Sequence, residues 1–148
     1  MTTTEIDQAA QLSAYEQIRN RVRKVLSGPA AFHGAAMRTL GEEFIKIAHT
    51  GNPDKIKAFL DGGFPPTFQD PVYGQTALHI FAAGRARKAF RILLKSEQLD
   101  YLIRDNQGRL ASELAFLVGK DIAMARLLRI KERKQADEQD IVLTRRPK

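Results

Sequence analysis

An internal repeat of 34 residues constrains the fold of this chain more than any other feature. Gly74 begins a run of small and apolar residues, and Gly108 begins a second run 34 residues later. An aspartate precedes each glycine: Asp70 four residues before Gly74, and Asp105 three residues before Gly108. A fixed period of this length is typical of supersecondary units that bury their apolar faces by stacking on one another. The sequence therefore predicts a stack of repeated units.

Each of the two runs leads into a short helix, a break and a second apolar helix. The breaks are Gly84-Arg85 and Gly119-Lys120, and the second helices are expected over residues 86–96 and 121–133. An earlier copy, ending at Gly63, keeps this order but lacks the opening glycine. Three copies are therefore expected within residues 41–135.

The unit resembles the ankyrin repeat, and the middle copy carries the clearest match. The matching residues there are Gly74, Thr76, Leu78, His79, Ala82, Leu93 and Leu94. The first copy matches at Ala48, Gly51, Phe59, Leu60 and Gly63, and the third at Asp105, Gly108, Ala115, Gly119, Leu127 and Leu128. This resemblance implies an all-α fold: an ankyrin-like helix-turn-helix repeat solenoid with a helical N-terminal cap.

The repeat motif has a structural chemistry. Gly74 permits the turn that reverses the chain, and Thr76 is placed to cap the following helix. By resemblance, His79 bridges the threonine hydroxyl and nearby backbone, which makes it a structural histidine. The motif also shows departures: Ala77, Phe81 and Arg85 replace proline, alanine and glycine, and the third copy has Leu110, Ser112 and Glu113 at the Thr, Leu and His positions. We expect the third copy to lack the polar capping network.

The segments that flank the repeats are assigned supporting roles. Residues 4–27 hold no glycine or proline and predict one amphipathic helix that ends at Gly28-Pro29. Residues 30–40 are rich in alanine and fit either a short helix or a packed connector. We therefore expect an N-terminal helical cap over residues 1–40 and a flexible basic tail over residues 136–148.

The charge of the chain is basic and regional. Its 148 residues include 24 Lys and Arg against 17 Asp and Glu, a formal charge of +7, which favours an anionic partner. On the helix over residues 86–96, Arg87, Arg91 and Lys95 recur at every fourth position. The candidate anion-binding residues are Arg87, Lys88, Arg91, Lys95 and Arg129. A solvated basic face is the alternative interpretation.

Catalytic and metal-binding chemistry finds little support in the sequence. The chain has no cysteine, which excludes disulfides, thiolate metal sites and a cysteine nucleophile. Its three histidines are His33, His49 and His79, and none of the common phosphate-binding, hydrolase or metalloprotease motifs is present. We expect no enzyme activity, no metal and no cofactor.

The hydropathy of the sequence excludes a membrane-spanning helix that is formed by one long apolar run. No stretch reaches 18 apolar residues, and the first residues are polar and acidic, unlike a signal peptide. The absence of cysteine suits a reducing compartment. A cytoplasmic location is the expectation.

The loops between the expected repeats supply the candidate partner-binding residues. Exposed aromatic and apolar side chains dominate the energetics of interfaces. The candidates are Phe68, Val72 and Tyr73 in the first loop, Tyr101 in the second, and Lys46 and Ile80 on the inner helices. Phe64 is expected to pack under the first loop, Phe68 fits packing there equally well, and Ile103 is expected to be buried.

Three functional hypotheses follow from these patterns. The first is a protein-interaction module, acting as an adaptor, an inhibitor or a subunit of a complex, with another protein as its partner. The second is a basic-face binder of nucleic acid or another polyanion, although no nucleic-acid-binding motif is present. The third, by resemblance to exported ankyrin-type proteins, is a secreted bacterial effector with a basic C-terminal signal.

Overall fold

The computed structural model describes residues 3–28, 33–96 and 99–143, and every regular element within these ranges is an α-helix. The helices are α1 (Thr3–Leu26), α2 (His33–Thr50), α3 (Pro53–Asp61), α4 (Ala77–Gly84), α5 (Arg87–Leu94), α6 (Ala111–Leu117) and α7 (Ile122–Glu138). The prediction of an all-α protein is confirmed. None of the described helices combines the length and the apolar character that crossing a membrane requires.

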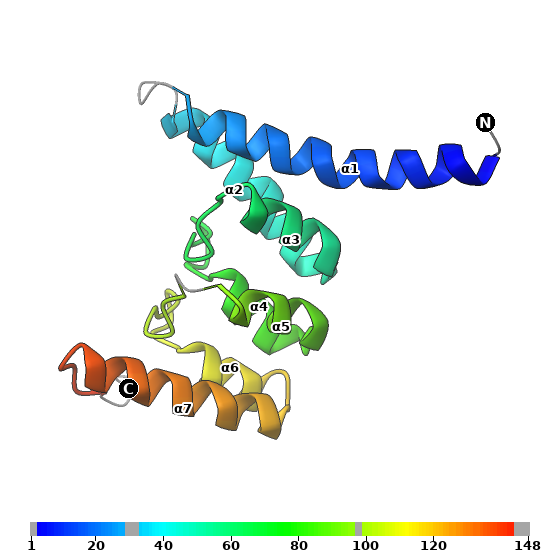
Figure 1. The fold of residues 1–148 in the computed structure, drawn as a ribbon. Coiled ribbons are helices and arrows are strands. Elements are labelled where there is room, and N and C mark those ends of the chain that lie inside the picture. The colour runs from blue at the N-terminus through cyan, green and yellow to red at the C-terminus, as the bar shows by residue number, and fades with distance from the viewer. Residues whose placement is uncertain (1–2, 29–32, 97–98, 144–148) are drawn as a thin grey trace.

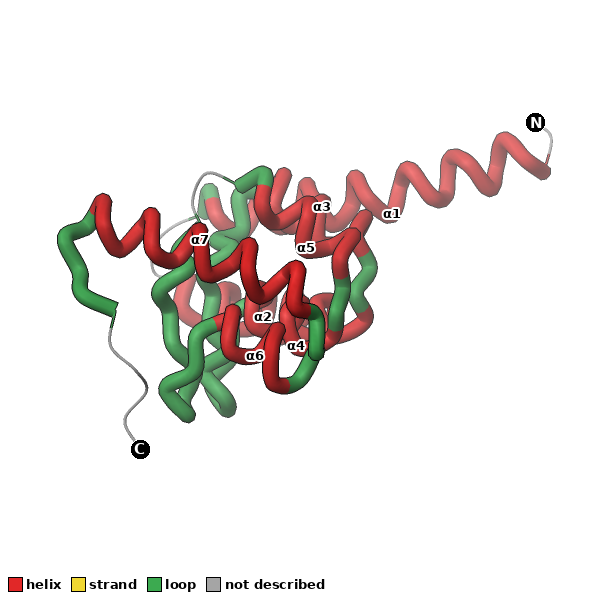
Figure 2. Tube along the Cα trace, turned by 90° about the horizontal axis from the view of Figure 1, so that it is seen from below, coloured by secondary structure: helices red, strands yellow, loops and turns green. Residues whose placement is uncertain are grey.

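The helices form successive antiparallel pairs that stack along one direction (Figure 1). The pairs are α2 with α3, α4 with α5 and α6 with α7, and α1 and α7 lie at opposite ends of the stack. Contacts between pairs run from α2 to α4, from α4 to α6 and from α3 to α5. Seen end-on, the long loops gather on one side of the molecule (Figure 2). The stack therefore presents one edge made of loops.

Helix α1 packs against α3 and α2 at the start of the stack. Its bounds confirm the helix expected over residues 4–27 to within one residue. Val22, on the expected apolar stripe, is fully buried, and a Cβ built on Gly62 would lie 2.8 Å from the Val22 side chain. The glycine thus lets the end of α3 approach α1 closely.

The expected boundary between cap and repeats does not exist as a break in the chain. Residues 33–40 are helical and continue without interruption into the first repeat as part of α2. The alanine-rich segment therefore becomes the first half of a long helix, with Leu40 and Phe44 both buried. Residues 29–32, which include Pro29, lie outside the described ranges.

A cluster of phenylalanines forms the core of the first half. The rings of Phe44, Phe59 and Phe64 lie with centroids 4.8 to 5.6 Å apart, in tilted and edge-on arrangements that aromatic pairs prefer. Phe64 is almost fully buried beneath the loop, as expected. This cluster fixes the position from which the first long loop departs.

The breaks between paired helices share one backbone conformation. Gly51 and Arg85 directly follow α2 and α4, Lys120 lies in the turn between α6 and α7, and all three have positive φ angles, between 51° and 68°. Left-handed residues end helices by directing the chain away, and glycine does so without strain. The second helices α5 and α7 begin one residue later than expected.

The C-terminal segment corrects one expectation. Helix α7 continues to Glu138, and Ala136 is buried, so residues 136–138 are part of the fold and not of a flexible tail. The Ile141 N–H donates to the Ala136 carbonyl at 2.8 Å. Residues 144–148, the basic end of the expected tail, lie outside the described ranges.

Candidate functional site

The first long loop is organised by the carboxylate of Asp70. Its Oδ1 accepts hydrogen bonds from the backbone N–H groups of Val72 and Tyr73, both at 2.8 Å, and its Oδ2 accepts from Gln75 N–H at 3.1 Å. The Asp70 N–H donates to the Gln75 carbonyl at 2.8 Å, which closes the loop across its base. The aspartate that precedes the repeat glycine therefore holds the tip of this loop.

The second long loop repeats this device with Asp105. Its Oδ1 accepts from the N–H groups of Gln107 and Arg109 at 3.0 and 2.9 Å, and the Arg109 side chain donates to Oδ2 at 2.9 Å. Burial of the Asp105 carboxylate opposes ionisation, but these hydrogen bonds outweigh it and hold the pKa of Asp105 below its ordinary value. The charged carboxylate is the form that the loop requires.

Hydrogen bonds tie the two loops to each other. The Asn106 backbone N–H donates to the Tyr73 carbonyl at 2.9 Å, and the Asn106 side chain donates to the Val72 carbonyl at 2.8 Å. Gly74 has a φ of +68°, and a Cβ built on it would lie 2.4 Å from the Asn106 side-chain oxygen. The position therefore needs glycine both for its conformation and for the close approach of the second loop.

His79, in the first turn of α4, links the start of its own helix to the second long loop. The Thr76 N–H donates to His79 Nδ1 at 3.2 Å, so this nitrogen carries no proton, and the Nε2–H donates to the Arg109 carbonyl at 3.0 Å. The Thr76 hydroxyl lies 2.9 Å from Nδ1 and accepts from the His79 backbone N–H, which completes a capping box. Burial lowers the pKa of His79 and keeps the ring neutral. The structural roles expected of Thr76 and His79 are confirmed.

The third copy retains a polar cap, contrary to expectation. Glu113, at the His79 position, accepts a hydrogen bond from the Leu110 N–H at 3.2 Å, which is half of the reciprocal box. Ser112 adds a second polar contact, because its hydroxyl donates to Glu132 on α7 at 2.6 Å. Glu132 is only 3% exposed, and burial raises its pKa. The sequence did not indicate this role for Glu132, because the charged residues around it in α7 are typical of a solvent-exposed helix.

Three of the predicted partner-binding residues are exposed. Val72 and Tyr73, at the tip of the first loop, expose 68% and 66% of their surface although their backbone is fixed on both sides. Lys46 is also exposed, on α2. The structure thus places two adjacent apolar side chains on a rigid tip and one cation on a helix.

The other three predicted partner-binding residues take part in packing. Ile80 is buried, at 6% exposure, because the face of α4 that carries it is turned toward the core. Phe68 is half-buried, with its ring centroid 5.6 Å from that of Phe64. Tyr101 is half-buried too, and its N–H donates to the Gln135 side chain at 2.6 Å. Ile103 is intermediate in exposure and not fully buried.

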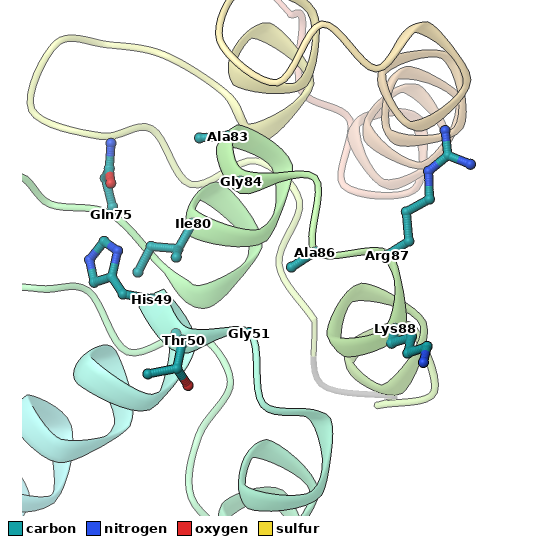
Figure 3. A pocket seen from close by; sticks show the side chains of 11 residues that line it. His49, Thr50, Gly51, Gln75, Ile80, Ala83, Gly84, Ala86, Arg87 and Lys88 are labelled. Atoms are coloured by element: carbon teal, nitrogen blue, oxygen red, sulfur yellow. The ribbon is translucent and has the colours of Figure 1, made fainter.

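An open pocket of about 550 Å³ lies between the end of α2 and the α4–α5 pair (Figure 3). Ile80 and Ala83 supply its apolar wall, and His49, Gln75 and Lys88 add polar groups. Ile80 is the one lining residue that sequence analysis predicted to bind a partner, and neither His49 nor Gln75 was expected at this surface. An apolar wall beside polar groups suits a side chain of a docking segment.

The predicted anion-binding set divides in two. Arg87 donates two hydrogen bonds to Asp121, at 2.8 and 2.9 Å, and its partner carboxylate is almost fully buried. Asp121 also caps α7 by accepting from the Met124 N–H. The hydrogen bonds from Arg87 hold the pKa of Asp121 below its ordinary value. Arg87 therefore joins two helix pairs although its own side chain is exposed, and Lys88, Arg91, Lys95 and Arg129 are exposed too.

The described residues include no cluster of three His, Asp or Glu side chains placed to hold a metal ion. The chain matched no family of known proteins, no curated protein and no solved structure.

Proposed function

We propose that this protein is a non-catalytic, ankyrin-like interaction module that binds another protein through the loop edge of its helical stack. One observation carries the proposal. Val72 and Tyr73 are two-thirds exposed, yet their backbone is held by Asp70 from within the loop and by Asn106 from the next loop. An apolar pair ordered before binding loses little further entropy in a complex, and such preorganisation strengthens association.

Several features support the ankyrin-like part of the proposal. The 34-residue spacing of Gly74 and Gly108 falls on two loops of the same construction, and the Thr76–His79 pair caps the helix between them. The helix pairs are stacked with their long loops on one side (Figure 2). These are the traits on which repeat proteins build extended binding surfaces.

The inner helices support a protein partner more than a small ligand. The pocket of Figure 3 is open and lies on the inner helices α2 and α4, with Lys46 exposed further along α2. An exposed aromatic tip, an open pocket with an apolar wall and an exposed cation together resemble the anchors of protein interfaces.

The proposal is tested by affinity purification from the natural source of the protein. The wild type is compared with a Val72→Ser plus Tyr73→Ala variant and with Val142→Ser, a matched control at an exposed apolar residue near the C-terminus. We expect a discrete protein to co-purify with the wild type and the control, and to be lost with the double variant. Equal recovery with all three would contradict the proposal.

Binding of a polyanion remains a second candidate function, favoured by the exposed cations Lys88 and Arg91 on α5 and Lys95 at its C-terminal end. Because Arg87 is paired with Asp121, this face has one fewer unpaired cation than the sequence indicated. If the face binds nucleic acid, affinity must fall steeply between about 50 and 200 mM salt, because phosphate contacts release counterions. Co-purification that disappears on nuclease treatment would favour this candidate.

A further inference from the structure

The last helix pair ends the stack with an apolar surface. Bulky side chains on α6, α7 and the turn between them are more than half exposed: Phe116, Leu117, Val118, Ile122 and Ile130. A groove of about 480 Å³ lies between the two helices. Terminal units of repeat proteins ordinarily carry a polar outer face, which keeps them soluble. The outer face of this last helix pair is instead apolar, which indicates that a partner covers it.

We define the end groove as the hollow lined by Phe116, Leu117, Ile122, Ala125, Arg126 and Arg129. One period earlier, the positions of Phe116 and Leu117 are occupied by Ala82 and Ala83 in α4, a helix that α6 covers. The surface of α4 that another helix pair covers therefore carries small residues. The equivalent surface of α6, which no described helix of the chain covers, carries large apolar residues. The end groove is shaped to receive something other than a further repeat of the same kind.

The junction inside the molecule shows which charges cross between stacked pairs. There, Arg87 of the α4–α5 pair binds the carboxylate of Asp121, which belongs to the next pair. Arg126 and Arg129 line the end groove on its α7 side. The acidic residue that also lines this hollow is Glu113, which already accepts from Leu110 N–H and lies 3.7 Å from Arg104. The end groove therefore offers apolar surface beside cations that an incoming carboxylate can pair.

A second copy of the chain fits this groove poorly. Two end grooves facing each other would bring the arginines of both copies together, and like charges that meet across an interface disfavour association. The charges favour an acidic occupant.

We propose that the end groove binds an amphipathic helix of a partner protein, with apolar side chains along one face and carboxylates beside them. The apolar face covers Phe116, Leu117 and Ile122, and the carboxylates pair with Arg126 and Arg129. A helix laid into an apolar groove is a recurring mode of recognition. This site lies at the end of the stack and does not depend on the loop tip at Val72 and Tyr73.

The test uses two labelled synthetic peptides and the full chain. Both peptides are helical, about five turns long, with leucines along one face; one carries glutamates beside them and the other lysines. Fluorescence anisotropy measures binding to the wild type, to Ile122→Gln, to Arg126→Glu plus Arg129→Glu, and to the control Val142→Gln. Circular dichroism confirms that each variant is folded.

We expect the acidic peptide to bind the wild type and the control at least about tenfold more tightly than the basic peptide. Ile122→Gln weakens both complexes, and the double arginine variant reverses the charge preference. The Val72→Ser plus Tyr73→Ala variant binds the acidic peptide normally, which separates this site from the loop tip.

Three results would overturn the proposal. The first is equal affinity for the two peptides, and the second is no binding of the acidic peptide at about 1 mM, an affinity too weak for a specific site. The third is a concentration-dependent dimer in analytical ultracentrifugation that Ile122→Gln abolishes, since a second copy would then cover the groove.

Discussion

The middle and third copies build the same turn with different chemistry. In both, an aspartate carboxylate holds the loop tip, through Asp70 in one and Asp105 in the other. The helix that follows is capped by the Thr76–His79 box in the middle copy but by Glu113 alone in the third. The backbone of the repeat is therefore preserved while the groups that satisfy it change.

The difference follows from position in the stack. The middle copy has neighbours on both sides, and its buried, neutral His79 reaches the carbonyl of Arg109 in the next loop. The third copy has no described helix beyond it, so Glu113 remains partly exposed and the buried Ser112–Glu132 contact stays within its own helix pair. An interior copy thus uses polar groups to join units, and an end copy uses them to close itself. The predictions below test this contrast.

The largest expected difference in stability is between alanine substitutions at two glycines, Gly84 and Gly119, which lie at equivalent breaks between paired helices. A Cβ on Gly119 would lie 2.3 Å from the backbone oxygen of Ala82, whereas nothing lies within 4 Å of a Cβ on Gly84. Gly119→Ala should destabilise the fold by about 2–3 kcal/mol, because backbone moves less readily than a side chain. Gly84→Ala should be neutral or slightly stabilising. Chemical denaturation measures both, and equal effects would contradict the close packing of α4 on the α6–α7 turn.

The next largest difference in stability is expected between substitutions of His79 and Glu113, the residues at the third helical position of α4 and α6. His79→Ala leaves the buried Arg109 carbonyl and Thr76 N–H without a partner and should destabilise by about 2 kcal/mol. Glu113→Ala removes one cap bond from a partly exposed side chain and should destabilise by about 0.5–1 kcal/mol. Urea denaturation curves give both values. A larger loss for Glu113→Ala would overturn the assignment of His79 as the residue that joins the units.

The pH dependence of stability should have opposite signs in the two copies. The pKa of His79 is lowered in the fold, so its contribution is present above the unfolded value of about 6.5 and is lost as pH falls. The pKa of Glu132 is raised, so its contribution is present at acid pH and is lost as pH rises through the folded value.

Two variants test these signs. His79→Gln should flatten the fall in stability between about pH 7 and 5. Glu132→Gln keeps a partner for Ser112 and should stabilise the fold by about 1 kcal/mol near pH 8, where the raised pKa of Glu132 disfavours folding most, with little effect near pH 4. Thermal unfolding across this pH range provides the measurement. A pH profile unchanged in either variant would refute the corresponding sign.

The smallest effect concerns the link between the copies. Arg87→Ala should lower stability, because it leaves the buried carboxylate of Asp121 with fewer partners. Arg91→Ala, at an exposed position one turn later on the same helix, should leave the denaturation midpoint unchanged. If both variants behave alike, the Arg87–Asp121 pair does not join the units.

Much of the architecture could be predicted from spacing alone. The repeat located the breaks at Gly84 and Gly119, and the stripe containing Val22 identified the first helix. The end of α7 was missed because its last turn is polar except for Ala136, whose burial depends on the fold of the whole chain. The continuity of α2 was missed because alanine-rich segments lack periodicity.

The site was less accessible to sequence reasoning than the fold. Exposure of Val72 and Tyr73 was expected from their place in the loop between two repeats, but burial of Ile80 depends on which face of α4 turns inward. Arg87 lies on an exposed line of cations in the sequence, and its partner Asp121 is 34 residues away. Contacts between units cannot be read from a pattern within one unit.

The central claim, that the tip of the first loop contacts a protein partner, is tested most directly by site-specific crosslinking. The photoreactive residue p-benzoylphenylalanine is placed at position 73 in one protein and at position 138, an exposed position at the end of α7, in another. After irradiation in cells of the natural source, we expect one discrete protein adduct from position 73 and none of that mass from position 138. No adduct at position 73, or the same adducts from both positions, would contradict the claim.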